Sequence, residues 1–189
     1  YHVTRSFLIP KWIEQIAYQD KSGSFDLSSL RILGSGGESL KPYLVENLLK
    51  KYPDLKILNL YGPTETTMFT TCKLVSLDDA KSNFITIGRP IFGSRLAVVN
   101  SGLEFLPPNT EGELIVYEDS SSIKNIAKGY LNLPAQTENK FVSVYNPVLN
   151  TVVKAYRTGD IVKLSTDGEI EFIGRDDDVV KVNGGYLVA

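Results

Sequence analysis

The sequence predicts an α/β lobe with a mostly parallel sheet, followed by a small β-barrel-like lobe. Up to about residue 75, short apolar runs alternate with helical patterns, which is typical of βα units. From about Gly88 the chain has short strand-like runs separated by Gly, Pro, Asn and Asp, without a helix-length apolar stripe. A length of 189 residues suits one domain or two small lobes. We therefore expect one lobe at residues 1–90 and a second at residues 91–176.

The first lobe is expected to contain two helices and two strands. One helix begins at Pro10, and a second covers residues 42–52, because a proline suits the first helical turn and Pro53 cannot continue the helix. Residues 29–33 and 56–60 are the expected strands. Since α/β sheets bind ligands at the carboxyl ends of their strands, the residues that follow these strands are candidates for a site.

The second lobe is expected to consist of strands alone. They cover residues 95–99, 113–117, 151–156, 161–165 and 169–173. Asp167 and Gly168 lie between the last two and form a typical hairpin-turn pair.

The bulk composition excludes several classes of function. With 42% hydrophobic and 22% charged residues, the chain is typical of a globular protein. A net charge of −2 gives no basic surface for nucleic acid or an anionic membrane. The sequence has no apolar run long enough to span a membrane and no charged-then-apolar leader, so we expect neither a membrane span nor a signal peptide. Cys72 is the single cysteine and His2 the single histidine, so neither an internal disulfide nor a zinc cluster is expected. We expect a cytoplasmic protein in which Cys72 is a buried structural thiol.

A glycine-rich stretch at residues 34–39 (Gly-Ser-Gly-Gly-Glu-Ser) follows the first expected strand. Glycines allow the backbone to approach a ligand closely, and the following helix would offer free amides. A plain strand-to-helix turn with positive φ angles explains the same residues, and taken alone it is the simpler interpretation.

Residues 59–67 follow the second expected strand and carry the groups that an ATP site needs. Tyr61 offers a ring to stack on a base, Thr64 a hydroxyl for phosphate oxygens, and Glu65 a carboxylate for Mg²⁺. The alternative is a Gly-Pro turn with a solvated glutamate, which leaves the length of the pattern unexplained.

A third pattern is Tyr-Arg-Thr-Gly-Asp at residues 156–160, with Arg175 fifteen residues after Asp160. A carboxylate after a glycine turn suits bonding to ribose hydroxyls, and an arginine can reach the same sugar or the phosphate. Arg175 could also pair with the acidic run at residues 176–178 at the surface.

Together these segments resemble the core motifs of the adenylate-forming superfamily, which includes nonribosomal peptide synthetase adenylation domains, acyl- and aryl-CoA ligases and luciferases. Residues 59–65, 112–116 with 128–131, 156–160, and 174–177 with 180–184 match four of its motifs in order. The Gly-Pro-Thr-Glu form and the spacing up to residue 156 resemble peptide synthetase adenylation domains more than CoA ligases.

The resemblance implies a role for each matching residue. Asn59 and Tyr61 would contact adenine, Asp160 and Arg175 the ribose, Thr64 the phosphate, and Glu65 the Mg²⁺, so that Thr64 and Glu65 are the catalytic candidates. The cofactor site would also include Gly37, Glu38 and Phe172. The acyl pocket would be lined by Gly34, Gly36, Leu60, Met68 and Phe69, although Met68 and Phe69 also fit an ordinary buried strand. Asp177 would be the hinge of a C-terminal lid that begins within residues 177–189, with Lys181 as the hinge-motif lysine.

By the same resemblance, the chain lacks the phosphate loop and the catalytic lysine of the family. The parent enzyme would use ATP and Mg²⁺ to convert a small carboxylic acid into an acyl-adenylate and pass it to the phosphopantetheine of a carrier protein domain. We expect this chain alone not to adenylate. The alternatives are part of an acyl- or aryl-CoA ligase and a non-catalytic binding or scaffold module. A non-catalytic module would have no reason to keep all four of the expected ligands, which are Thr64, Glu65, Asp160 and Arg175.

Overall fold

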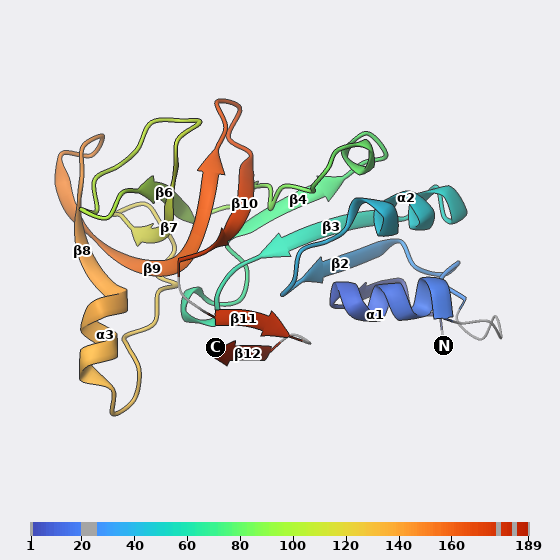
Figure 1. Ribbon diagram of the computed structural model, residues 1–189, viewed down its shortest axis with the longest axis horizontal. Helices are drawn as coiled ribbons and strands as arrows, with labels where there is room; N and C mark the ends of the chain where they lie inside the picture. The colour runs from blue at the N-terminus through green and yellow to red at the C-terminus, as the bar shows by residue number, and fades with distance from the viewer. Residues whose placement is uncertain (1, 20–25, 177–178, 183–184, 189) are drawn as a thin grey trace. The chain divides into compact units, whose positions relative to one another are not determined.

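The computed structural model describes residues 2–19, 26–176, 179–182 and 185–188 (Figure 1). The chain divides into two compact units. The first contains Tyr1–Leu60, Cys72–Ile87 and Val179–Ala189, and the second contains Tyr61–Thr71 and Gly88–Asp178. The loop after residue 60 therefore belongs to the second unit. None of the helices in the described part of the chain combines the length and the apolar character that crossing a membrane requires.

The first unit is an α/β layer built on parallel strands. Strands β1 (Arg5–Phe7), β2 (Ile32–Gly36), β3 (Lys56–Tyr61) and β4 (Thr71–Val75) are neighbours in that order, and the β1–β2 and β2–β3 pairs are parallel. Figure 1 shows helices α1 (Pro10–Glu14) and α2 (Pro42–Lys51) beside these strands. A π-helical turn, Gln15–Gln19, follows α1, and a 3₁₀ turn, Asp79–Lys81, follows β4.

Both helices pack on one face of this sheet. Ile13 of α1 and Val45 of α2 belong to the same buried cluster as Leu33 of β2 and Ile57 of β3. Leu33 and Ile57 are register partners, so they point to the same side. The alternate residues of these strands therefore lie on the opposite face.

The expected helix at residues 42–52 is confirmed, and it ends at Lys51 because Tyr52 precedes a proline and has an extended φ of −129°. The strand expected at residues 29–33 begins later, at Ile32, and continues to Gly36. The interpretation of residues 34–39 as a turn was wrong for Gly34 and Gly36, which lie in the strand. The turn begins at Gly37, whose φ is +86°.

The second unit is built on an antiparallel sheet. Its main strands, β6 (Arg95–Val99), β7 (Glu111–Glu118), β9 (Thr151–Leu164) and β10 (Ile170–Arg175), follow the order β10–β9–β7–β6. β8 (Phe141–Asn146) pairs with the first half of β9, and three of its partners there, Lys154, Ala155 and Tyr156, also pair with β7. β8 and β10 therefore share the edge of β9 opposite to β7. The described strands follow this open path, so the expected barrel-like lobe is not confirmed.

The two strands expected at residues 151–156 and 161–165 are one strand, β9, because Gly159 takes a φ of +73° inside it without ending the pairing with β7. The hairpin turn at Gly168 is confirmed, with φ of +87° and a hydrogen bond from its N–H to Ser165 O.

Seven further elements of the described chain were not expected, namely β1, β4, β5 (Arg89–Pro90), β8, α3 (Pro134–Lys140), β11 (Val179–Val182) and β12 (Gly185–Val188). β5 has two residues, and α3 buries none of its side chains, which explains why it lacks the apolar stripe of a core helix. β11 and β12 form a separate antiparallel hairpin.

Candidate functional site

The loop after β3 closes on itself and presents two of the candidate residues. Thr70 N–H donates to Tyr61 O at 2.8 Å, which brings the two ends of the loop together. Gly62 is required here, because a Cβ at this position would lie 2.4 Å from Met68 O. Between the two ends, a 3₁₀ turn, Thr64–Thr66, leaves Thr64 exposed and Glu65 half-buried.

Met68 does not fit the alternative of an ordinary buried strand. Its side chain is 65% exposed, and its φ of 76° is in the left-handed region that a β-strand excludes. Phe69 is half-buried and precedes β4.

Three candidate residues from different motifs meet at one carboxylate in the second unit. Asp160 is 2% exposed, accepts a short hydrogen bond from Tyr61 OH at Oδ2, and pairs through Oδ1 with Arg175 Nη1 at 2.7 Å. Burial, with the charge of Asp160 beside it, raises the pKa of Tyr61 well above its usual value, so the phenol keeps its proton and remains a donor. Each carboxylate oxygen of Asp160 therefore accepts a hydrogen bond from a different motif.

A buried glutamate holds the backbone before Asp160. Glu113 of β7 accepts hydrogen bonds at Oε2 from Arg157 Nε and Nη2, at 2.9 and 2.7 Å, and at Oε1 from Gly159 N–H at 3.0 Å. The hydroxyl of Thr158 donates to Leu114 O at 2.7 Å and accepts from Asp160 N–H at 3.0 Å. The strand β9 therefore presents Asp160 from a backbone that these hydrogen bonds fix over residues 157–160.

Glu65 is engaged by a second group of side chains. Tyr130 OH donates to Glu65 Oε1 at 2.5 Å and lies 3.2 Å from Tyr156 OH. Burial raises the pKa of the Tyr156 phenol, and its hydrogen bond with Tyr130 adds to the rise. Sequence reasoning placed Glu113 and Tyr130 inside matching motifs but gave neither a role, because their partners are distant in the chain.

The donor set around Glu65 suits a metal ion that is shared with phosphates. Within the described ranges, no three His, Cys, Asp or Glu side chains come together as a metal-binding group. Mg²⁺ is usually held by one or two carboxylates together with substrate phosphates, and a half-buried Glu65 with an exposed Thr64 beside it is such a partial set.

In the first unit, Gly34 and Gly36 lie on the sheet face opposite to the helices. A Cβ on Gly34 would lie 3.0 Å from Leu60 Cδ1 and 3.2 Å from Phe7 Cδ2, and one on Gly36 would lie 2.3 Å from Leu60 O. The two glycines therefore allow Leu60 and Phe7 to approach the strand closely. Phe7, which is 45% exposed, had not been singled out in the sequence.

Asn59 lies on the face that the helices cover. Its side-chain amide donates to Thr86 O at 2.8 Å, and the residue is 4% exposed. Its register partner Ser35 is fully buried, and Ser35 Oγ has no hydrogen-bond partner among the described residues.

The remaining candidates are distributed over both units. Gly37 begins the turn after β2, and Glu38 follows it half-buried. Phe172 lies on β10 beside Val162, immediately before a β-bulge. Asp177 lies outside the described residues.

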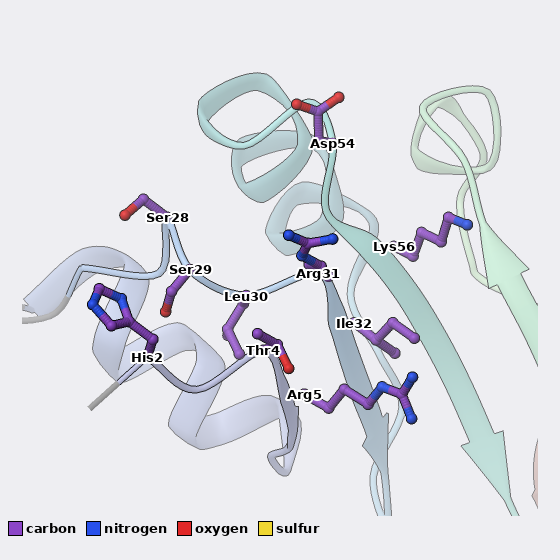
Figure 2. A pocket seen from close by; sticks show the side chains of 10 residues that line it. All are labelled: His2, Thr4, Arg5, Ser28, Ser29, Leu30, Arg31, Ile32, Asp54 and Lys56. Carbon is purple, nitrogen blue, oxygen red and sulfur yellow. The ribbon is translucent and has the colours of Figure 1, made fainter.

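One cleft of the first unit does not contain any of these candidates. It measures about 950 Å³ and lies at the amino ends of β1, β2 and β3, where Arg5 and Lys56 lie on β1 and β3 and Arg31 immediately precedes β2 (Figure 2). The candidates of the first unit lie in the carboxyl-terminal parts of β2 and β3 and in the turn after β2. The cleft therefore carries no part of the predicted chemistry.

Residues 1–131 match the family described as AMP-binding enzyme. The chain belongs to this family. Within the AMP-binding enzymes, it is 38% identical over 182 residues to tyrocidine synthase 3 of Brevibacillus parabrevis, which covers 96% of this chain and 3% of that protein. It is 36% identical over 182 residues to gramicidin S synthase 2 of Aneurinibacillus migulanus, covering 96% of this chain and 4% of that protein.

Solved structures show the same fold. The NRPS protein holo-PA1221, which contains adenylation and PCP domains and is bound to a vinylsulfonamide inhibitor, matches with a TM-score of 0.87 and 32% identity. The match covers 98% of this chain and 31% of that one. The Vibrio cholerae adenylation domain AlmE, in complex with glycyl-adenosine-5'-phosphate, matches with a TM-score of 0.80 and 29% identity over 98% of this chain and 34% of its own. The chain thus spans a small part of its curated relatives and about a third of these structures.

Proposed function

We propose that this chain is part of a nonribosomal peptide synthetase adenylation domain. The whole protein uses ATP to activate an amino, hydroxy or aryl acid and passes the acyl group to the phosphopantetheine thiol of a carrier protein domain. The observation that carries the proposal is the buried carboxylate of Asp160, on which Tyr61 and Arg175 converge. Support comes from the similar proteins, one of which is an adenylation domain in complex with an acyl-adenylate and another of which contains a PCP domain.

The proposed reaction has two steps. A carboxylate oxygen of the acid attacks the α-phosphorus of ATP, the bond from that phosphorus to the bridging oxygen breaks, and pyrophosphate leaves. The thiolate of the carrier then attacks the carbonyl carbon of the acyl-adenylate, and AMP leaves with the electron pair of the broken acyl–oxygen bond.

In this proposal Asp160 accepts hydrogen bonds from the ribose hydroxyls, and Arg175 reaches the same sugar. Asn59 and Tyr61 contact the adenine. The nucleotide site also includes three residues from β10 and the turn after β2, namely Gly37, Glu38 and Phe172.

Glu65 is the proposed metal ligand, and Thr64 donates its hydroxyl to a phosphate oxygen. A Mg²⁺ bound there would neutralise negative charge on the phosphates as the pyrophosphate leaves. Glu65 holds this position because the 3₁₀ turn and Tyr130 fix its backbone and its carboxylate.

The acid is proposed to bind against an uncharged wall. Glycines allow close approach, and an apolar or aromatic acid suits such a surface. The proposed lining residues are Gly34, Gly36, Leu60, Met68 and Phe69, and Phe7 joins them because it packs against Gly34. Asp177 remains the proposed hinge of a lid that begins within residues 177–189.

The test is exchange of radiolabelled pyrophosphate into ATP by the whole protein that carries these residues. A panel of amino, hydroxy, keto and aryl acids is offered one at a time. The proposal predicts exchange with a subset of the acids and subsequent loading of a carrier protein rather than free CoA. Absence of exchange with every acid, in a protein shown to be folded, would contradict it, and transfer to CoA alone would favour a CoA ligase.

A further inference from the structure

A segment of the second unit, residues 125–130, lies along the loop that carries Glu65. Thr67 Oγ1 donates to Asn125 O at 2.9 Å, and Asn125 Nδ2 donates to Thr66 O at 3.2 Å. Ala127 N–H donates to Glu65 O at 2.8 Å. Three hydrogen bonds therefore hold this loop, two at its backbone carbonyls and one at the Thr67 side chain, in addition to any contact of the Glu65 side chain.

The segment ends in Tyr130, whose phenol reaches the carboxylate itself. Tyr130 OH lies 2.5 Å from Glu65 Oε1 and 3.2 Å from Tyr156 OH. An ionised carboxylate can only accept, so the single phenolic proton of Tyr130 goes to Glu65. Tyr156 must then be the donor to Tyr130, and the two phenols form a chain that points toward Glu65.

The ring of Tyr130 is fixed from its other sides. Its backbone N–H donates to Thr137 Oγ1 at 2.9 Å, and its ring makes an edge contact with Phe141 at 5.4 Å between centroids. Phe141 in turn contacts the ring of Tyr156 at 5.1 Å. The phenol therefore has little freedom to leave Glu65.

We propose that Tyr130 is a positioning residue for Glu65, which it holds in the orientation that binds the metal ion of a metal–ATP complex. This inference rests on the proposed function. A phenol that occupies one carboxylate oxygen fixes the rotamer and directs the other oxygen toward the ligand. Outer partners of metal-binding side chains typically change metal affinity by about 10- to 100-fold when they are removed. None of the four motif matches assigns Tyr130 this role.

The test compares Tyr130→Phe with the wild-type whole protein. Phenylalanine keeps the ring contact with Phe141 and removes only the hydroxyl. Binding of Mn²⁺, measured by electron paramagnetic resonance with a non-hydrolysable ATP analogue, is expected to weaken by about 10- to 100-fold. The Mg²⁺ concentration for half-maximal pyrophosphate exchange should rise by a similar factor, with the maximal rate at saturating Mg²⁺ largely retained.

Tyr117→Phe is the matched control, because Tyr117 lies on β7 in the same unit and contacts Phe105 rather than the Glu65 loop. It should bind Mn²⁺ like the wild type. If Tyr130→Phe does not fold, Tyr156→Phe replaces it, and a weakening of at least threefold is expected because Tyr130 then loses its donor.

The outcomes separate the two proposals. Unchanged Mn²⁺ affinity in a folded Tyr130→Phe variant, or in the Tyr156→Phe replacement, would overturn the inference while leaving the proposed function intact. A wild-type protein that binds no metal–ATP complex would overturn both.

Discussion

Replacing Glu113 by alanine removes the carboxylate that fixes the backbone before Asp160. The Glu113 side chain is 8% exposed and that of Arg157 27% exposed. The change breaks three hydrogen bonds, two from Arg157 and one from Gly159 N–H. Breaking a fully buried ion pair costs about 3–5 kcal/mol, because the remaining charge is left without a partner. Since Arg157 can be partly hydrated, we expect a smaller loss, about 2–3 kcal/mol of the unfolding free energy.

The assay is equilibrium unfolding of the chain in urea at pH 7, followed by circular dichroism. Glu111→Ala is the matched control, because Glu111 is an exposed glutamate two residues earlier on the same strand, and it should change stability by less than about 0.5 kcal/mol. Glu113→Gln keeps an acceptor for Gly159 N–H, so it should lose less unfolding free energy than Glu113→Ala.

A double-mutant cycle separates the ion pair from other effects. If Glu113 acts through Arg157, the cycle with Arg157→Met should give a coupling free energy of about 1–3 kcal/mol. The reasoning is refuted if Glu113→Ala unfolds at the same urea concentration as Glu111→Ala. It is also refuted if the effects of Glu113→Ala and Arg157→Met on the unfolding free energy are additive.

Three further changes test other parts of the structure. Ser35→Ala should leave the stability of the chain unchanged or raise it by about 1 kcal/mol in thermal or urea unfolding, because Ser35 Oγ is buried without a partner in the described part of the chain, and a clear loss of stability would reveal an unrecognised one. Burial raises the pKa of Cys72, so iodoacetamide at pH 8.5 should alkylate the folded chain more slowly than the urea-unfolded chain, and equal rates would contradict this. Hydrogen bonds, first from Ser121, lower the pKa of Asp119 to about 2, so its contribution to stability should be lost as the pH falls from about 4 to 2. Carboxyl titration by NMR should show this value rising in Ser121→Ala.

The sequence alone was sufficient to predict the helices and strands whose signals are local. Residues 42–51 form a helix because a proline begins it and another follows it, and β6 has the expected bounds. Residues 151–164 were divided in two because Gly159 is a turn residue in most contexts. β7 pairs with β9 on both sides of Gly159, and this pairing, which keeps β9 continuous, is invisible without the partner strand.

The site was only partly predictable for the same reason. Tyr61 and Arg175, which bond to Asp160, were recognised as candidates because their residue types and their order in the sequence match those of a nucleotide site. Cys72 was expected to be buried but is half-buried on β4. Glu113 and Tyr130 act on partners 44 and 65 residues away, so no local pattern could assign their roles. The only signal for them was the resemblance of residues 112–116 and 128–131 to a family motif.

The most direct test of the central claim is calorimetric titration of Mg²⁺–ATP into the whole protein and its Asp160→Asn variant. Asparagine has nearly the same shape but lacks the charge that Arg175 and the ribose hydroxyls would share. We predict saturable binding by the wild type and a loss of about 10-fold or more in Asp160→Asn, since a hydrogen bond to a charged group contributes about 1.5–3 kcal/mol. Asp167→Asn, in the exposed hairpin turn, should bind like the wild type. Equal affinity of wild type and a folded Asp160→Asn variant would contradict the nucleotide site described for this carboxylate.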